Sequence, residues 1–167
     1  MIGSSGAGKS VFAARLAERT GLPLIHLDAI YWKPGWVATP KDEWTRIVDD
    51  LLARDAWVMD GNYAGTLDRR LAACDTAIFL DFPRVVCLWR AVKRRIIHHG
   101  RSRPDMAPDN DERLTWEFAR WIWTYPRERR PGVLAKLDTL RPDQRAVLLR
   151  SGADAERFLR TLPPDGA

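Results

Sequence analysis

The sequence predicts an α/β domain built on a parallel β-sheet, and two observations lead to this prediction. Strand-like and helix-like segments alternate along the chain, a pattern typical of βαβ units. Residues 3–10 read Gly-Ser-Ser-Gly-Ala-Gly-Lys-Ser, which matches every fixed position of the G-x-x-x-x-G-K-[ST] phosphate-binding loop. Together they predict a P-loop NTPase fold.

The phosphate-binding loop also specifies a ligand chemistry. Gly3, Gly6 and Gly8 allow the backbone to curl with its N–H groups pointing inward around an anionic oxygen. Lys9 supplies a positive charge for the β- and γ-phosphates, and the Ser10 hydroxyl can ligate Mg²⁺ at the start of a helix. We therefore expect a nucleoside triphosphate as the ligand, bound by Gly3, Ser4, Ser5, Gly6, Ala7, Gly8, Lys9 and Ser10. The alternative is a Gly/Ser turn that only caps a helix.

The strand that normally precedes such a loop is very short here. Only Met1 and Ile2 stand in front of Gly3. A central strand of a parallel sheet needs more residues than this to pair with both of its neighbours. We therefore expect the first strand to be truncated, through a misassigned start codon or loss of upstream residues, and expect an apolar stretch of four to six residues directly upstream in the reading frame.

The remaining elements follow in a regular order. A helix begins at the loop, and a helix over 41–54 has Thr39 or Asp42 as a possible cap. The other expected strands are 22–27, 56–59, 77–80 and 146–149, and the other expected helices are 85–97, 112–125 and 153–162. Because this is one βα series of 167 residues, we expect a single domain over residues 1–167.

Composition narrows the class of protein. With 46% hydrophobic and 29% charged residues, the chain can bury an adequate core. It has no run near the ~18 apolar residues of a membrane span and no secretory signal pattern, so we expect a cytoplasmic protein without a membrane partner, as a monomer or weak dimer. Cys74 and Cys87 are expected to be buried, reduced thiols. The net charge of +5 suits polyanionic ligands without naming one.

Three of the predicted strands end in an aspartate: Asp28, Asp60 and Asp81. In open α/β sheets the ligand lies beyond the carboxyl ends of the strands. We expect Asp60 to hold Mg²⁺ opposite Ser10, and Asp28 to be catalytic by accepting a proton from the acceptor hydroxyl or orienting that hydroxyl. The alternative for each is a turn or capping residue, which is the favoured interpretation of Asp81.

A basic cluster follows the fourth strand. Arg90 and Arg94 share a face of the predicted helix, and a phosphate between them would relieve their repulsion. Phosphoryl transfer needs cations around the transferring group, so Arg90 is expected to bind nucleotide and Arg94, Arg103 and Arg113 to be catalytic together with Lys9. The segment 96–110 contains one glycine and two prolines and is the expected lid. A solvated basic helix is the alternative.

Several motifs resemble those of adenylate-kinase-type enzymes. In chain order they are Asp60-Gly61 after an apolar strand, Ile78-Phe79-Leu80-Asp81, Arg90-x-x-x-Arg94-Arg95, and Arg103-Pro104-Asp105 followed by Glu112-Arg113-Leu114. A closer resemblance, nearly end to end, is to the bacterial DNA topology modulation (FlaR) proteins, a branch of the adenylate-kinase-like P-loop proteins. It rests on His26-Leu27-Asp28, Trp32-x-Pro34-Gly35-Trp36, Trp57-Val58-Met59-Asp60-Gly61-Asn62-Tyr63 and Arg103-Pro104-Asp105-Met106. The resemblance implies a nucleoside-monophosphate-kinase-like, five-stranded parallel sheet of order 2-3-1-4-5 with helices on both faces.

The chain departs from adenylate kinases on the acceptor side. It has Asn62-Tyr63 where they carry Pro-Arg, and so lacks an arginine that grips the acceptor phosphate, which argues against AMP. The short lid contains no Cys-x-x-Cys, which excludes a zinc lid. Aromatic side chains that could stack on a base or sugar ring are expected near the acceptor instead, namely Tyr31, Trp32, Trp36 and Tyr63.

These features predict an ATP-dependent kinase that uses Mg²⁺ and transfers the γ-phosphate to a small nucleotide, nucleoside or sugar-like acceptor. The alternative is a nucleotide-dependent, DNA-associated protein without kinase turnover. Nucleic acid is the less favoured partner because the chain has no recognisable nucleic-acid-binding motif, and because its basic residues fall where a kinase lid requires them.

Overall fold

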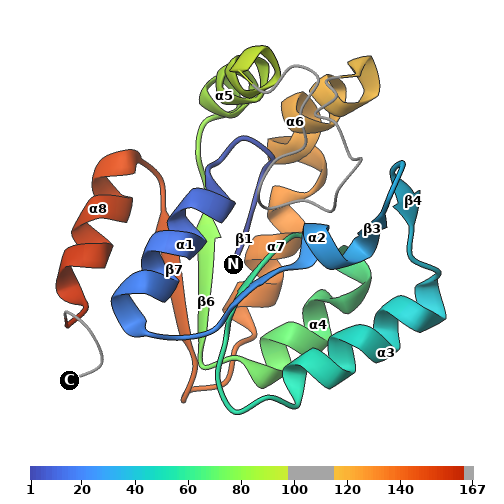
Figure 1. Ribbon diagram of the computed structural model, residues 1–167. Coiled ribbons are helices and arrows are strands. Elements are labelled where there is room, and N and C mark those ends of the chain that lie inside the picture. Colours follow the sequence, from blue (N-terminus) through green and yellow to red (C-terminus); the bar gives the residue numbers. More distant parts are fainter. Residues whose placement is uncertain (98–114, 164–167) are drawn as a thin grey trace.

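A computed structural model describes residues 1–97 and 115–163 of the chain as strands and helices that alternate along most of their length (Figure 1). The strands are β1 (Ile2–Gly3), β2 (Leu24–His26), β3 (Trp32–Lys33), β4 (Val37–Ala38), β5 (Val58–Asp60), β6 (Thr76–Leu80) and β7 (Arg145–Leu149). The helices are α1 (Lys9–Thr20), α2 (Leu27–Tyr31), α3 (Lys41–Leu52), α4 (Ala64–Ala73), α5 (Arg84–Ile97), α6 (Trp116–Glu128), α7 (Arg130–Asp138) and α8 (Gly152–Thr161).

The long-range strand pairs are parallel, which confirms the predicted α/β class. β1, β6 and β7 form one sheet in the order β1-β6-β7, and β2 pairs with β5. The first sheet is joined to β5 through Met1, whose amino group donates to the Met59 carbonyl and whose carbonyl accepts from the Gly61 N–H at 3.3 Å. A strand of two residues is too short for a continuous ladder on both sides. The order 2-3-1-4-5 in one five-stranded sheet therefore stays a prediction at the step from strand 3 to strand 1.

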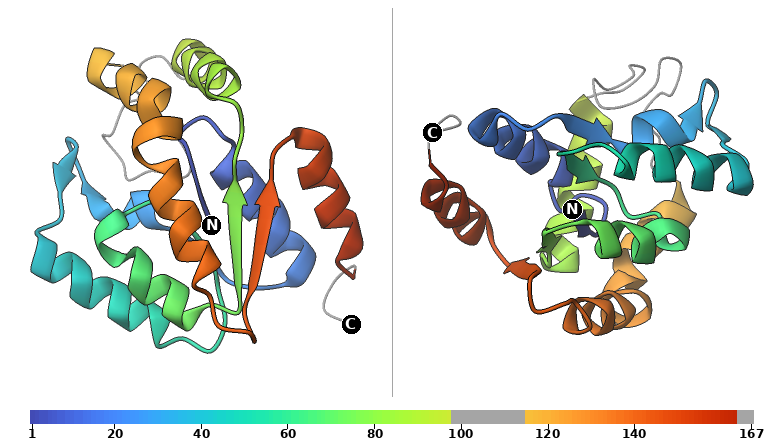
Figure 2. Two further views of the ribbon diagram at one scale, coloured as in Figure 1. Left: turned by 180° about the vertical axis from the view of Figure 1, so that it is seen from behind. Right: turned by 90° about the horizontal axis from the view of Figure 1, so that it is seen from below.

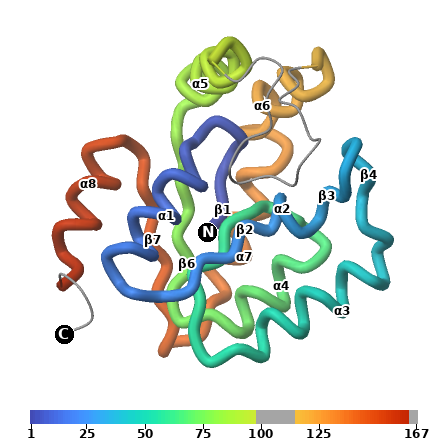
Figure 3. Tube along the Cα trace, in the orientation of Figure 1, coloured from blue at the N-terminus to red at the C-terminus, as the bar shows by residue number. Residues whose placement is uncertain are grey.

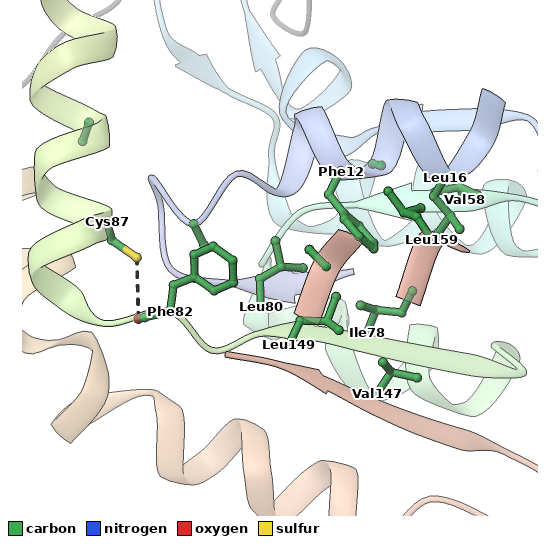
Figure 4. Close-up of a cluster of buried hydrophobic side chains, with 14 of the residues drawn as sticks. Phe12, Leu16, Val58, Ile78, Leu80, Phe82, Cys87, Val147, Leu149 and Leu159 are labelled. Carbon is green, nitrogen blue, oxygen red and sulfur yellow. Dashed lines mark hydrogen bonds between the residues drawn. The ribbon is translucent and has the colours of Figure 1, made fainter. Parts of the chain in front are cut away.

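Helices cover both faces of the β1-β6-β7 sheet (Figure 2). Alternation along β6 sends Ile78 and Leu80 into one cluster and Ala77 and Phe79 into another. The first cluster receives apolar side chains from α1 and α8 (Figure 4), and the second receives them from α4, α6 and α7. The β-sheet is thus sandwiched as a parallel sheet requires.

A third cluster lies over the β2-β5 pair. Trp44, Val48 and Leu51 of α3 are buried against Ile25 and Met59. They occupy the apolar face expected for a helix over 41–54, and α3 ends at Leu52. The expected cap was wrong: Pro40 takes the N-cap position and no side chain caps the helix. Instead, the Thr39 hydroxyl donates to the Tyr31 carbonyl at 2.7 Å.

Several local elements differ from the sequence-based expectation. The second strand ends at His26, because Leu27 and Asp28 already belong to the first turn of α2. The antiparallel β3-β4 hairpin and the helices α2, α4 and α7 were not predicted. The two-residue strands, the five-residue α2 and the weak apolar periodicity of α7 give little signal in the sequence. Cys74 and Cys87 are buried free thiols, as expected.

The expected lid at about 96–110 lies largely outside the described residues. So do Arg103, Arg113 and the start of the helix expected at 112. The described part of that helix begins at Trp116, where the Thr115 hydroxyl accepts the Phe118 N–H at 3.2 Å. Within residues 1–97 and 115–163, no helix is both long and apolar enough to cross a membrane.

Candidate phosphate-binding cleft

The predicted phosphate-binding loop connects β1 directly to α1 (Figure 3). Gly6 and Gly8 have φ angles of 79° and 93°, in the left-handed region that favours glycine. At Gly6 a Cβ would lie 2.0 Å from the Cys87 carbonyl oxygen, so the loop packs directly against the backbone of α5. Glycine is required at position 6 for two reasons: the positive φ angle, and the lack of space for a Cβ atom.

The first turn of α1 presents the groups expected to bind phosphate. Gly8 is its N-cap and no side chain caps the helix, so the leading N–H groups remain available to an anion. The Lys9 ammonium folds over the loop and donates to the carbonyls of Gly3, at 3.1 Å, and Ser4, at 3.2 Å. Its positive charge is thereby held at the loop itself, where a phosphate would be bound.

The loop opens onto a cleft of about 1260 Å³. This exceeds the ~300–1,000 Å³ typical of a site for one small ligand, so two molecules can fit. Of the predicted site residues within the described part of the chain, those lining the cleft are Ser5, Gly6, Ala7, Gly8, Lys9, Ser10, Asp28, Arg90 and Arg94. Gly3 and Ser4, the first two residues of the loop, are buried. The structure thus brings together residues from three segments of the sequence.

Arg90 ties α5 to the phosphate-binding loop. Its Nη1 donates to the Ala7 carbonyl at 3.1 Å, and its guanidinium lies 5.0 Å from the centre of the Phe82 ring. Arg94 lines the same cleft one helical turn further along. The two arginines therefore share the face that the sequence predicts, and that face is turned toward the cleft.

Asp60 does not line the cleft and is only 5% exposed. One carboxylate oxygen is 3.3 Å from Nδ1 of His26, its register partner on β2, whereas Oδ1 has no hydrogen-bond partner among the described residues. Burial alone would raise the pKa of Asp60. The hydrogen bond with His26, the charge of Lys9 and the nearby Ser10 hydroxyl outweigh burial and hold the pKa below its ordinary value. A buried carboxylate kept ionised, with one oxygen unpaired, fits a site for a cation or its bound water.

The protein would supply only some of the ligands of a cation bound here. The described residues include no group of three or more histidine, cysteine, aspartate or glutamate side chains arranged to hold a metal ion. Mg²⁺ commonly takes one or two protein ligands and completes its shell with water and phosphate oxygens. Ser10 with Asp60 fits that pattern.

Asp28, which lines the cleft, is paired with Tyr63. The Tyr63 hydroxyl donates to Oδ1 of Asp28 at 2.6 Å. Burial and the neighbouring carboxylate raise the pKa of Tyr63, so the phenol stays protonated and remains a donor. Tyr63 also packs on Tyr31 and Trp44, with ring centres 4.6 and 4.9 Å away. Asp28 is thus held in a fixed orientation at the cleft wall.

The loop 61–63 links the Asp28–Tyr63 pair to the phosphate-binding loop. The Asn62 side-chain oxygen accepts the Gly3 N–H at 3.1 Å. From behind, the buried guanidinium of Arg70 donates to the carbonyls of Gly61, at 2.8 Å, of Asn62, and of Tyr63, at 3.2 Å. Sequence reasoning missed His26, Asn62 and Arg70. His26 and Asn62 stand at strand ends and within the motifs that resemble the FlaR proteins, but nothing in the sequence indicates what they contact, and Arg70 has no signal at all.

Asp81 does not belong to the cleft. Its two carboxylate oxygens accept hydrogen bonds from Nε and Nη2 of Arg130, at 2.7 and 2.8 Å. This bidentate ion pair fixes α7 to the end of β6. This pairing supports the structural interpretation of Asp81.

Comparison with known proteins adds little. No family model matches the chain, and no curated protein matches it. Among solved structures, a sugar kinase from Janibacter sp. HTCC2649, in its unliganded form, is similar with 20% sequence identity and a TM-score of 0.47, over 95% of this chain and 90% of that one. A similarity this distant bears on neither the fold nor the function of the chain.

Proposed function

We propose that this protein is an ATP-dependent phosphotransferase that acts on a small hydroxyl-bearing acceptor. We further propose that it belongs to the FlaR branch of the adenylate-kinase-like P-loop proteins. One observation carries the proposal. The glycine-rich loop with Lys9 and the fixed Asp28–Tyr63 pair line the same cleft, which has room for two ligands. A phosphate donor and a hydroxyl acceptor could therefore meet there.

The donor side would bind by positive charge and backbone N–H groups. The loop and the first turn of α1 would surround the β- and γ-phosphates, with Lys9 exchanging its carbonyl partners for phosphate oxygens. Arg90 and Arg94 would neutralise charge on the transferring group, the largest contribution a protein makes to this kind of reaction. We also expect Arg103 and Arg113 to join them.

Ser10 and Asp60 would hold Mg²⁺ on the donor side, Ser10 through its hydroxyl and Asp60 through a water molecule. Bound there, the ion would supply neutralisation of phosphate charge. Asp60→Asn should spare most of the nucleotide affinity measured without metal and remove most of the Mg²⁺-dependent gain, because the amide loses the negative charge. Titration calorimetry with ATP, with and without Mg²⁺, measures this. An undiminished gain would place the ion elsewhere.

Asp28 would act on the acceptor. Its carboxylate, oriented by Tyr63, accepts the proton of the acceptor hydroxyl as that oxygen forms its bond to the γ-phosphorus and the bond to the bridging oxygen of the departing ADP breaks. The products are the phosphorylated acceptor and ADP, with the proton on Asp28 released to solvent afterwards.

The decisive test compares two lysine variants. Lys9→Ala should abolish ATP binding in calorimetry and turnover with an acceptor panel while the protein still unfolds cooperatively, because the ammonium is held at the loop and not in the apolar core. Lys93→Ala, an exposed residue of α5 outside the cleft lining, is the matched control and should leave ATP affinity unchanged. Unaltered ATP affinity in Lys9→Ala would refute the phosphate-loop assignment.

The same proteins separate the kinase from a DNA-associated role. Duplex binding through about six phosphate contacts should weaken about a thousandfold between 50 and 200 mM salt, whereas nucleotide binding should change far less. If Lys93→Ala weakens duplex binding and no acceptor stimulates ATP turnover, the DNA-associated function replaces the kinase.

A further inference from the structure

The acceptor side of the cleft is walled by aromatic rings. Tyr31, Trp32 and Trp36 line it together with Tyr63. The rings brace one another edge-on, with centres 4.9 Å apart between Tyr31 and Trp32 and 5.5 Å apart between Trp32 and Trp36. Such tilted pairs hold the rings in place, and aromatic rings that line a cleft are apolar platforms of the kind that stack on a planar base or the C–H face of a sugar.

The placement of Trp36 is conformationally costly. It sits in the β3-β4 hairpin with a φ angle of 62°, directly after Gly35, which also has a positive φ of 76°. A bulky residue rarely adopts this region, and the strain of about 1–3 kcal/mol must be offset elsewhere. Residues held in this way cluster at ligand-binding sites. The turn brings Trp36 back onto Trp32 at the cleft instead of leaving it at the hairpin tip.

The positive charges near this wall are engaged elsewhere. Lys33 is paired with Glu43 at 3.2 Å, Arg69 with Asp49 at 3.0 Å, and Arg70 is buried on the backbone of the loop 61–63. Between residues 22 and 70, all of which the structure describes, no lysine or arginine lines the cleft. The carboxylate of Asp28 is the negative group on this wall.

We infer, on the basis of the proposed function, that the acceptor is an uncharged ring compound with a free hydroxyl, a nucleoside or a monosaccharide, and not a nucleotide. Its hydroxyl donates to Asp28 and its ring lies on the platform of Tyr31, Trp32 and Trp36. A phosphate monoester in the same place would set its negative charge beside Asp28, with no described lysine or arginine on that wall to compensate. At a separation of about 5 Å this repulsion weakens binding by about tenfold or more.

Binding of neutral compounds and of their monophosphates tests the inference directly. Calorimetry would use adenosine, cytidine, thymidine, D-ribose and D-glucose, each paired with its 5′- or 6-monophosphate, on protein saturated with a non-hydrolysable ATP analogue and Mg²⁺. We expect at least one neutral compound to bind at least tenfold more tightly than its monophosphate. The pair that binds also tells a nucleoside site from a monosaccharide site.

Two variants connect that preference to the proposed wall. Trp36→Ala should weaken binding of the neutral compound at least tenfold without changing the affinity for the ATP analogue. Trp89 is an exposed tryptophan of α5 outside the cleft lining, so the control substitution Trp89→Ala should change neither affinity. Asp28→Asn should shrink the preference for the neutral compound over its monophosphate, because the repelling charge is gone.

The outcomes are distinct. A monophosphate that binds as tightly as its neutral parent, or no neutral compound binding at 10 mM while the ATP analogue binds, overturns the acceptor inference and leaves the proposed ATP chemistry standing. Failure of the ATP analogue itself to bind overturns the proposed function first. An unchanged preference in Asp28→Asn would show that the carboxylate does not set the acceptor charge.

Discussion

Replacing Arg70 with methionine removes the guanidinium that holds three consecutive carbonyls of the loop 61–63. The Arg70 side chain is buried, and the loop it supports carries Tyr63 with a φ angle of 30°, a strained value for a non-glycine residue. Methionine retains much of the apolar stem but donates no hydrogen bond. We therefore expect a loss of both stability and acceptor positioning.

The size of the effect follows from two opposing contributions. Each hydrogen bond from a charged donor stabilises by about 1.5–3 kcal/mol, so the three together contribute roughly 5–9 kcal/mol. Against this, burial lowers the pKa of Arg70 from its ordinary value to about 10, which corresponds to a cost of about 3 kcal/mol. The net loss in Arg70→Met is therefore about 2–6 kcal/mol, or a fall in Tm of roughly 10 °C near the middle of that range.

Urea unfolding measures this loss, and the neighbouring arginine on the same helix provides the control. Arg69 is half exposed and paired with Asp49, also half exposed, so Arg69→Met should cost less than about 1 kcal/mol. In the folded fraction of Arg70→Met, the KM for the acceptor should rise more than the KM for ATP, because Tyr63 no longer fixes Asp28. A cost under about 1 kcal/mol for Arg70→Met would refute the argument that this buried cation holds the loop.

Two further changes test the phosphate-binding loop and the core. Gly6→Ala should destabilise the fold by more than about 3 kcal/mol in urea unfolding, because its new methyl group would lie 2.0 Å from the Cys87 carbonyl oxygen. Gly8→Ala is the control and should cost only the left-handed strain of about 1–2 kcal/mol. Equal effects of the two substitutions would contradict the close contact with α5. Phe79→Ala, at a fully buried position of β6, should lower the free energy of unfolding by about 3–5 kcal/mol, measured by thermal denaturation. Val85→Ala, on the exposed face of α5, is the control and should change it by less than about 0.5 kcal/mol. A small loss for Phe79→Ala would mean that the core closes around the cavity.

The sequence by itself was sufficient for the features made by contiguous residues. The octet from Gly3 to Ser10 sets its own backbone path, because three glycines, a lysine and the start of a helix are local properties. The strong apolar runs of β6 and β7 and the amphipathic face of α3 were readable for the same reason, since period and propensity act within a few residues. The predicted α/β class and parallel pairing followed from those elements in order.

The tertiary structure alone decided which side chains meet. His26 and Asp60 are 34 residues apart, Tyr63 and Asp28 are 35 apart, and Asp81 and Arg130 are 49 apart. Each pair depends on strand order, on register and on the angle at which a helix packs, none of which is encoded within a local window. That is why Asp60 acquires a histidine partner, Asp28 a tyrosine and Asp81 an arginine, although all three follow apolar strand-like segments in the sequence. Long-range packing gives these three similar residues different partners.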